Sequence, residues 1–263
     1  MRTREDTRNF WLLAAVAGLI VAMGLGAAHH MELNGHIVTG MNNQIVWGLP
    51  HVFAVFLVVA ASGALNVASM ASVFGKTEFK PLAPLSGVLA IALLIGGLTI
   101  LMLDLGRPDR LIVAMTYYNF KSIFALNIFL YSGFMGFVIV YLWTMMERSM
   151  NRFTPLAGLA AFVWRMALTT GTGSIFGFLV ARQAYDSALL APLFIALSFS
   201  YGLAVFLLVL MLASRGSGRA LGDALLARFA RLQVIFIAAG LYFVLVYYLT
   251  NLYFTRHHDF DRF

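Results

Sequence analysis

Long stretches without a charged side chain are the feature that most restricts the folds open to this protein. Six apolar runs have no Lys, Arg, Asp or Glu in their interiors, and a seventh contains only Arg165. An α-helix needs about 20 apolar residues to cross the hydrocarbon core of a membrane. The sequence therefore predicts an all-α integral membrane protein, a polytopic bundle of about seven transmembrane helices, at 10–28, 48–74, 84–104, 123–146, 156–181, 188–213 and 232–254.

The overall composition agrees with a membrane protein. Of the 263 residues 61% are hydrophobic and 11% are charged, whereas soluble domains average roughly 25% charged residues. One water-soluble core cannot hide this much apolar surface, so we expect a single transmembrane domain over 1–263. The formal net charge is +7, but the basic residues lie in short loops between the apolar runs. They therefore indicate membrane topology, and we expect no nucleic acid among the partners.

The loop charges predict which way the bundle faces. Cytoplasmic loops of membrane proteins carry an excess of Lys and Arg, and the loop at 29–47 has neither. We therefore predict a cytoplasmic N-terminus. The basic residues on the predicted cytoplasmic side are Arg2, Arg4, Arg8, Lys76, Lys80, Arg148, Arg152, Arg215, Arg219, Arg228 and Arg231, against Arg107, Arg110, Lys121, Arg182, Arg256 and Arg262 on the outer side.

The absence of cysteine limits the redox chemistry of the protein. With no cysteine, the sequence allows no disulfide, no iron–sulfur cluster of its own and no c-type haem attachment. A bis-histidine haem needs paired histidines within the spans, and His51 alone lies near one. We therefore expect no haem and no metal site. The run at 10–28 is long enough to span the membrane and is not expected to be a cleaved signal.

The most polar connection runs from Asp104 to Asn127, between two apolar runs on the predicted outer side. Asp104 and Arg107 are three residues apart, close enough for an ion pair across one helical turn. Asn119 and Ser122 flank the start of the next helix, where both residue types are good N-caps. The segment is therefore either a solvated loop with capped helix ends or a binding site for the polar head of a lipid-soluble molecule.

A second polar segment precedes the second apolar run on the same side. Trp47 fits the aromatic belt at a membrane interface. His51 lies just inside the run, where a histidine is either a functional group or an interfacial side chain bonded to water or a carbonyl. A quinone head needs donors for its two carbonyls and a nearby proton exchanger, and histidine and carboxylate are the usual proton exchangers. The two segments together could form such a pocket.

Arg165 is the one ionised residue deep within an apolar run, roughly 13 Å along its helix at 1.5 Å per residue. One interpretation, which we slightly favour, is that it snorkels to the cytoplasmic face. The other is that it lines a polar proton path with neighbouring hydroxyls, namely Thr169, Thr170, Thr172 and Ser174.

The run LDLGRPDR followed by NFKSIFALN resembles the signature of the NrfD/PsrC family, the integral membrane subunits of respiratory complexes. TGMNNQIVWGL, ARQAYDSALLAPLF and YYLTNLYFTRHHDFDRF extend the resemblance over nearly all of the sequence. It implies a haem-free subunit, not catalytic on its own, in the bacterial cytoplasmic (inner) membrane. Such a subunit exchanges electrons between menaquinone or ubiquinone and a docked ferredoxin-like iron–sulfur subunit, which serves a molybdopterin-type or other catalytic subunit.

The resemblance also points to site residues. Matched by motif, the quinone site falls on Asp104, Arg107, Asn119 and Ser122, with Trp47 and His51 added by their position. Some relatives have a histidine near the position of Thr169, and its absence here weakens a proton relay. Family members continue with further helices after a segment like YYLTNLY, which suggests an N-terminal portion of a longer protein or a split subunit.

Three hypotheses for function remain from the sequence. The first is a quinone-binding subunit of an oxidoreductase, with or without coupled proton movement. The second is a solute or ion transporter, which would favour discontinuous helices and polar residues at mid-membrane, whereas most polar groups here lie at one face. The third is a passive membrane anchor without a quinone site.

Overall fold

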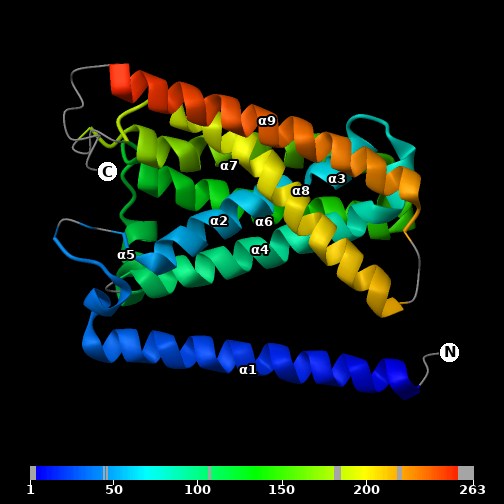
Figure 1. The fold of residues 1–263 in the computed structure, drawn as a ribbon, viewed down its shortest axis with the longest axis horizontal. Coiled ribbons are helices and arrows are strands. Elements are labelled where there is room, and N and C mark those ends of the chain that lie inside the picture. Colours follow the sequence, from blue (N-terminus) through cyan, green and yellow to red (C-terminus); the bar gives the residue numbers. More distant parts are fainter. Residues whose placement is uncertain are drawn as a thin grey trace.

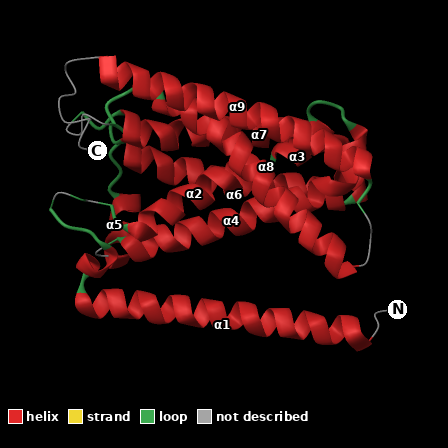
Figure 2. Cartoon of the chain, in the orientation of Figure 1, coloured by secondary structure: helices red, strands yellow, loops and turns green. Residues whose placement is uncertain are grey.

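The described part of the protein is helical throughout. The computed structural model describes residues 4–43, 45, 47–105, 108–180, 185–217 and 221–253, and these residues contain no strand (Figure 2). This confirms the predicted all-α class. The α-helices are α1 (Arg4–Asn34), α2 (Leu49–Ala64), α3 (Asn66–Ser72), α4 (Ala83–Asp104), α5 (Leu111–Thr116), α6 (Ile123–Met146), α7 (Thr154–Gly177), α8 (Leu190–Ser217) and α9 (Asp223–Tyr253), and the 3₁₀ turns are η1 (His36–Thr39), η2 (Thr77–Leu82), η3 (Pro108–Arg110) and η4 (Arg148–Phe153).

Within the described residues, six helical segments are long and apolar enough to cross a membrane. They include most or all of α1, α4, α6, α8 and α9 and the combined span of α2 and α3. The predicted multi-pass membrane protein is thereby confirmed. The helix α7 has more hydroxyl and glycine residues and also contains Arg165, yet it runs through the bundle alongside the others (Figure 1). It is not among the six segments, so the seventh predicted crossing stays a prediction.

The helix α1 stands apart from the rest of the bundle. It runs along one edge, separated from α4 (Figure 1), and no residue in its most apolar stretch is buried. The main core instead joins α2, α3, α4, α6 and α7 through side chains such as Leu65, Leu94, Phe134 and Leu168. A second cluster, with Phe206 and Phe229 among its members, attaches α8 and α9.

The second span is broken in the middle. The helix α2 ends at Ala64 and α3 begins at Asn66, so that Leu65 interrupts the regular backbone ladder. The hydroxyl of Ser86 in α4 fills the gap: it accepts a bond from the Ala68 amide at 3.1 Å and donates to the Ala64 carbonyl at 2.6 Å. A buried backbone group without a partner costs about 1–3 kcal/mol, so this side chain stabilises the break.

Arg165 binds at the same break. Its side chain is 0% exposed, and Nη1 donates to the Ser62 carbonyl at 2.8 Å. The guanidinium also lies over the rings of Phe162 and Phe199, 5.1 and 4.7 Å from their centroids. The snorkelling interpretation is therefore wrong. The carbonyl end of α2 and two aromatic faces, both attractive to a cation, offer Arg165 partners inside the bundle.

The helices α2 and α8 cross closely at the same level. A Cβ atom added to Gly63 would overlap the backbone of Ser198, and one added to Gly202 would overlap Gly63 itself. Small residues at a crossing allow helix backbones in membranes to approach and gain van der Waals contact. This crossing holds the broken span against α8, so the position of α2 is fixed from several sides.

Candidate functional site

The site forms where α2 begins and α4 ends. Gly48 is the N-cap of α2 and Pro50 follows in its first turn, where the missing proline N–H does no harm. A Cβ on Gly48 would come within 2.8 Å of the Thr39 carbonyl oxygen, so only glycine lets the η1 turn pack there. His51 consequently enters the bundle beside Asp104, the last residue of α4.

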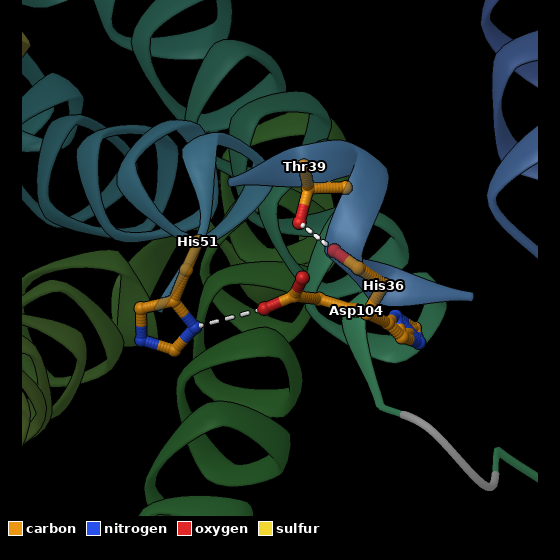
Figure 3. A network of polar contacts seen from close by, with 4 residues as sticks. All are labelled: His36, Thr39, His51 and Asp104. Carbon is orange, nitrogen blue, oxygen red and sulfur yellow. Dashed lines mark hydrogen bonds and ion pairs between the residues drawn. The ribbon is translucent and has the colours of Figure 1, made fainter. Parts of the chain in front are cut away.

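His51 and Asp104 form a partly buried pair. Nδ1 of His51 lies 3.3 Å from Oδ2 of Asp104, and the side chains are 14% and 6% exposed (Figure 3). The second ring nitrogen of His51 faces away from the carboxylate (Figure 3). Within the described part of the protein, the buried Oδ1 of Asp104 has no hydrogen-bond partner. Such an oxygen is costly to bury unless it receives a hydrogen bond, and a ligand hydroxyl could supply one.

Trp47 fixes the plane of the His51 ring. The two rings stack with centroids 5.3 Å apart and an interplanar angle of 9°. Trp47 is itself held edge-on by Phe176 of α7 at 5.0 Å and by Tyr185 at 5.7 Å. Aromatic pairs of this kind contribute about 0.5–1.5 kcal/mol beyond their buried area. The imidazole is therefore held by Trp47 on one face and oriented by Asp104 at its edge.

The pair lines a cavity of about 980 Å³ bounded by α2, α4, α5, α6 and α7. Its wall is mainly apolar, with residues such as Val58, Leu98 and Ile128. This volume is near the upper end of the roughly 300–1,000 Å³ typical of pockets for small organic ligands. The side chains in the wall that carry a polar or charged group include Trp47, His51, Thr99, Asp104, Arg110, Ser122, Asn127, Tyr131, Ser132 and Thr172.

Three of these polar side chains form a second cluster deeper in the cavity, on α6 and α7. The Thr172 hydroxyl lies 3.5 Å from Oδ1 of Asn127, and the Asn127 amide donates to the Ile123 carbonyl at 2.9 Å. Asn127, Tyr131 and Thr172 are all buried. The cavity wall thus contains two groups of polar side chains, the His51–Asp104 pair and this cluster.

A comparison with known protein families then identifies the type of protein. The family described as "Polysulphide reductase, NrfD" matches residues 37–260. The chain belongs to the NrfD family. The resemblance of the sequence motifs to this family is thereby confirmed.

Individual relatives agree with the NrfD assignment. The protein is 30% identical, over 93% of its length, to the Hdr-like menaquinol oxidoreductase integral membrane subunit of Archaeoglobus fulgidus. It is 22% identical over 94% of its length to a subunit of the selenate reductase of Mesobacillus selenatarsenatis. It is 28% identical over 64% of its length to a chain of the polysulfide reductase of Wolinella succinogenes. It spans 60%, 67% and 59% of the lengths of these relatives, respectively.

The predicted NrfD-type site residues are brought together only in part. Trp47, His51, Asp104 and Ser122 all line the cavity. Ser122 is also the N-cap of α6, accepting a bond from the Ala125 amide at 3.4 Å, so the capping interpretation holds for it too.

The other two predicted site residues are Asn119 and Arg107. Asn119 is exposed, its side-chain oxygen accepts a bond from the Lys121 amide at 3.0 Å, and it is not among the residues that line the cavity. Arg107, with its predicted ion pair to Asp104, lies outside the described residues. The cation that the structure does place in the cavity wall is Arg110.

Three of the residues predicted for a proton path, Arg165, Thr169 and Thr172, lie on one buried face of α7. Thr172 lines the cavity, and one turn further Thr169 lies 2.6 Å from the Ser62 hydroxyl and donates to the Arg165 carbonyl at 2.9 Å. Within the described structure, Nε and Nη2 of Arg165 have no hydrogen-bond partner. By contrast, Thr170 is exposed and is not part of this buried face.

Sequence reasoning missed Asn127 and Tyr131. Both lie within the first half of an apolar run, and their spacing of four residues puts them on the same helix face. An asparagine within a membrane span needs a partner, and this was the signal that could have singled it out. Within the described ranges, no group of three or more His, Cys, Asp or Glu residues could hold a metal ion.

Proposed function

We propose that this NrfD-family protein binds quinone or quinol in the cavity at the His51–Asp104 pair and serves as the quinone-reactive membrane subunit of a respiratory oxidoreductase. The observation that supports this most is a partly buried histidine–carboxylate pair inside a large, mainly apolar cavity. Apolar pockets with a few placed polar groups are typical of small-molecule sites. The name of the archaeal relative, a menaquinol oxidoreductase subunit, favours menaquinone over ubiquinone.

The pair suits the proton transfers of quinol oxidation. A quinol loses two electrons and two protons to become the quinone. The free ring nitrogen of His51 accepts a proton from one quinol hydroxyl, and Asp104 at Nδ1 stabilises the imidazolium that forms. In this proposal the polar cluster of Asn127, Tyr131 and Thr172 hydrogen-bonds the second oxygen of the ring. The proton of that second hydroxyl passes to water, as does the first proton when His51 releases it. Reduction of quinone uses the same groups in the opposite direction.

The electrons pass to a partner protein in this proposal. The sequence has no cysteine and thus no thiolate ligands for an iron–sulfur cluster. A ferredoxin-like iron–sulfur subunit docked on the outer face, serving a molybdopterin-type or other catalytic subunit, would receive or supply them. The relatives are named as parts of reductases or of an oxidoreductase, which supports such an assembly. We place it in the bacterial cytoplasmic membrane.

Proton movement toward the opposite face is a second element of the proposal. Thr172 at the cavity, Thr169 and Arg165 follow one another along the buried face of α7. Hydroxyls of this kind carry protons only through intervening water, and the unpartnered guanidinium nitrogens of Arg165 are groups that water would satisfy. The route therefore stays a prediction from the arrangement of three side chains.

A transporter is supported less well. The break at Leu65 and the buried Arg165 are the discontinuous helix and deep charge that transporters use. Here, however, the freed backbone groups are occupied by Ser86 and Arg165, so the break does not offer them to a solute. A flux assay in liposomes without partner proteins distinguishes a transporter, which would move a solute there, from a quinone-binding subunit, which would not. A passive anchor, in turn, predicts that no quinone analogue binds.

Substitution of Asp104 by Asn tests the proposal. The carboxamide keeps the shape but loses the charge that stabilises protonated His51. We expect quinol-linked turnover of the complete complex to fall by about a hundredfold or more, within the range typical of lost general acid–base catalysis. Assembly of the complex and the stability of the protein should be preserved.

The matched control is Asp223→Asn, the same chemical change at an exposed position at the start of α9. It should leave turnover unchanged. Binding of a fluorescent hydroxyquinoline N-oxide, a quinol analogue, to the purified wild-type protein gives a second readout that needs no partner. Normal turnover in Asp104→Asn, or no analogue binding by the wild type, would remove the quinone site from consideration.

A further inference from the structure

A proton taken up by His51 needs a way out of the bundle. The side chains of His51 and Asp104 are only 14% and 6% exposed, so the pair has little contact with bulk water. Each turnover nevertheless leaves a proton on the pair, and this proton must be removed before the next quinol reacts. Histidine and carboxylate exchange protons readily near neutral pH. A further group of this kind between the pair and the solvent would shorten the path.

His36 lies on a turn that borders the cavity. It is the first residue of η1, and Thr39 of the same turn packs so closely on Gly48, at the start of α2, that a Cβ atom there would overlap it. Met41, two residues after η1, is part of the cavity wall. The η1 turn is therefore seated at the end of the cavity where α2 begins.

His36 and Asp104 each have a buried polar atom without a partner. In the view of Figure 3, Asp104 lies between His51 on one side and His36 on the other. Within the described part of the protein, neither Nδ1 of His36 nor Oδ1 of Asp104 makes a hydrogen bond. Such atoms are costly to bury alone, and cavity water that bonds them would remove this cost. His36 as a whole is only half-buried, so it combines a buried ring nitrogen with access to solvent.

Other titratable side chains at this end lack that combination. Arg110 in the cavity wall keeps its proton and cannot pass one on. The other described side chains at this end that exchange protons near neutral pH are exposed, namely His29, His30, Glu32, Asp109 and Asp186. Among the described residues, His36 is therefore the best-placed group between the pair and bulk water.

We propose that His36 is the proton-exit group of the site: it receives the proton that a quinol has given to His51 and releases it to bulk water. This rests on the proposed quinone function and adds the path of the proton. After the quinone has left, water replaces its hydroxyl at Oδ1 of Asp104. The proton on the free nitrogen of His51 moves through this water to Nδ1 of His36, while Nε2 of His36 gives its own proton to the solvent. Exchange with water then returns His36 to its starting tautomer.

Substitution of His36 by Gln tests this role. The carboxamide still forms hydrogen bonds but cannot pass on a proton. We expect quinol-linked turnover of the complete complex to fall about tenfold in weakly buffered solution. This is less than the roughly 10²–10⁴-fold typical of a lost general base, because His51 still accepts the proton from the quinol. Added imidazole should restore most of the turnover, since a soluble base replaces the missing ring, and the wild type should respond little to it.

The matched control is His30→Gln, the same change at an exposed histidine whose ring bonds to Asn34. It should leave turnover unchanged with and without imidazole. His36→Asn is a second variant of the exit group and should behave as His36→Gln does. Binding of the fluorescent hydroxyquinoline N-oxide should be preserved in every variant, because the quinone site itself is intact.

Unchanged turnover in both His36 variants would overturn the proton exit. So would a loss that imidazole does not restore while the analogue still binds, because a side chain with a purely structural role gives that result. Loss of analogue binding in both variants would overturn it as well, since His36 would then be needed to form the site. If the wild type binds no analogue, the proposed quinone function fails instead, so the two failures are distinguishable.

Discussion

His51 depends on its neighbours for a defined orientation. An imidazole can rotate about two side-chain bonds, and only some orientations point a ring nitrogen at a ligand. Asp104 binds Nδ1 and Trp47 covers one face of the ring, which leaves the other nitrogen directed elsewhere. Trp47, which the sequence assigned equally well to an interfacial aromatic belt, is therefore best regarded as a positioning residue for His51.

A pair of substitutions at Trp47 tests this role. Trp47→Leu removes the stacked face, so we expect kcat/KM for quinol to fall about tenfold, equivalent to about 1.4 kcal/mol of transition-state stabilisation. Trp47→Phe keeps a ring on His51 and should stay within about threefold of wild type. Steady-state kinetics of the complete complex measure both. Equal activity of the Leu variant and the wild type would contradict the assignment.

At the residue scale, sequence patterns singled out polar side chains but did not identify contacts between helices. The predicted partner of Asp104 was Arg107, which lies outside the described residues. The structure shows a partner that the sequence did not predict, His51, which is 53 positions earlier in the sequence. Local spacing identifies contacts within one turn and cannot identify contacts between helices. Asn127 was missed for the same reason, because its value comes from Thr172 on another helix.

At the scale of elements, the spans were predictable and the break in the second span was not. The predicted run at 123–146 coincides with α6, and 84–104 differs from α4 by one residue. Hydrophobicity alone sets these limits, since the run must match the bilayer. The break at Leu65 depends instead on Ser86 and Arg165 from other helices, and the one proline of the run, Pro50, lies at its start and does not mark the break.

The role of Ser86 at the break can be measured as stability. Ser86→Ala leaves the Ala68 amide and the Ala64 carbonyl without partners, so we expect the free energy of unfolding to fall by about 1–3 kcal/mol. Thermal unfolding of the purified protein in detergent gives the comparison. Ser132→Ala is the matched control, because the Ser132 hydroxyl bonds only its own helix and its loss should cost little. Similar melting temperatures for both variants would show that the break does not need Ser86.

At the scale of the whole molecule, the orientation in the membrane remains the main prediction from loop charges. The sequence has no cysteine, so each introduced cysteine is a unique label. A cysteine at Asn43, before α2, should react with a membrane-impermeant maleimide in intact cells. A cysteine at Ser149, in η4, should react only after permeabilisation. The wild type serves as the unlabelled control, and the reverse pattern would show that the N-terminus faces outward.

The hydrogen bond from Arg165 to Ser62 also has a consequence for biosynthesis. Its two partners are 103 residues apart in the sequence, so the second span enters the bilayer long before the ribosome has made the residue that binds its exposed carbonyl. Until then, this carbonyl must either form a regular helix bond or be shielded by the insertion machinery. The early hairpin of α2, α3 and α4 already contains Ser86, so the break at Leu65 can form first, and the Ser62 carbonyl gains its final partner only when α7 joins.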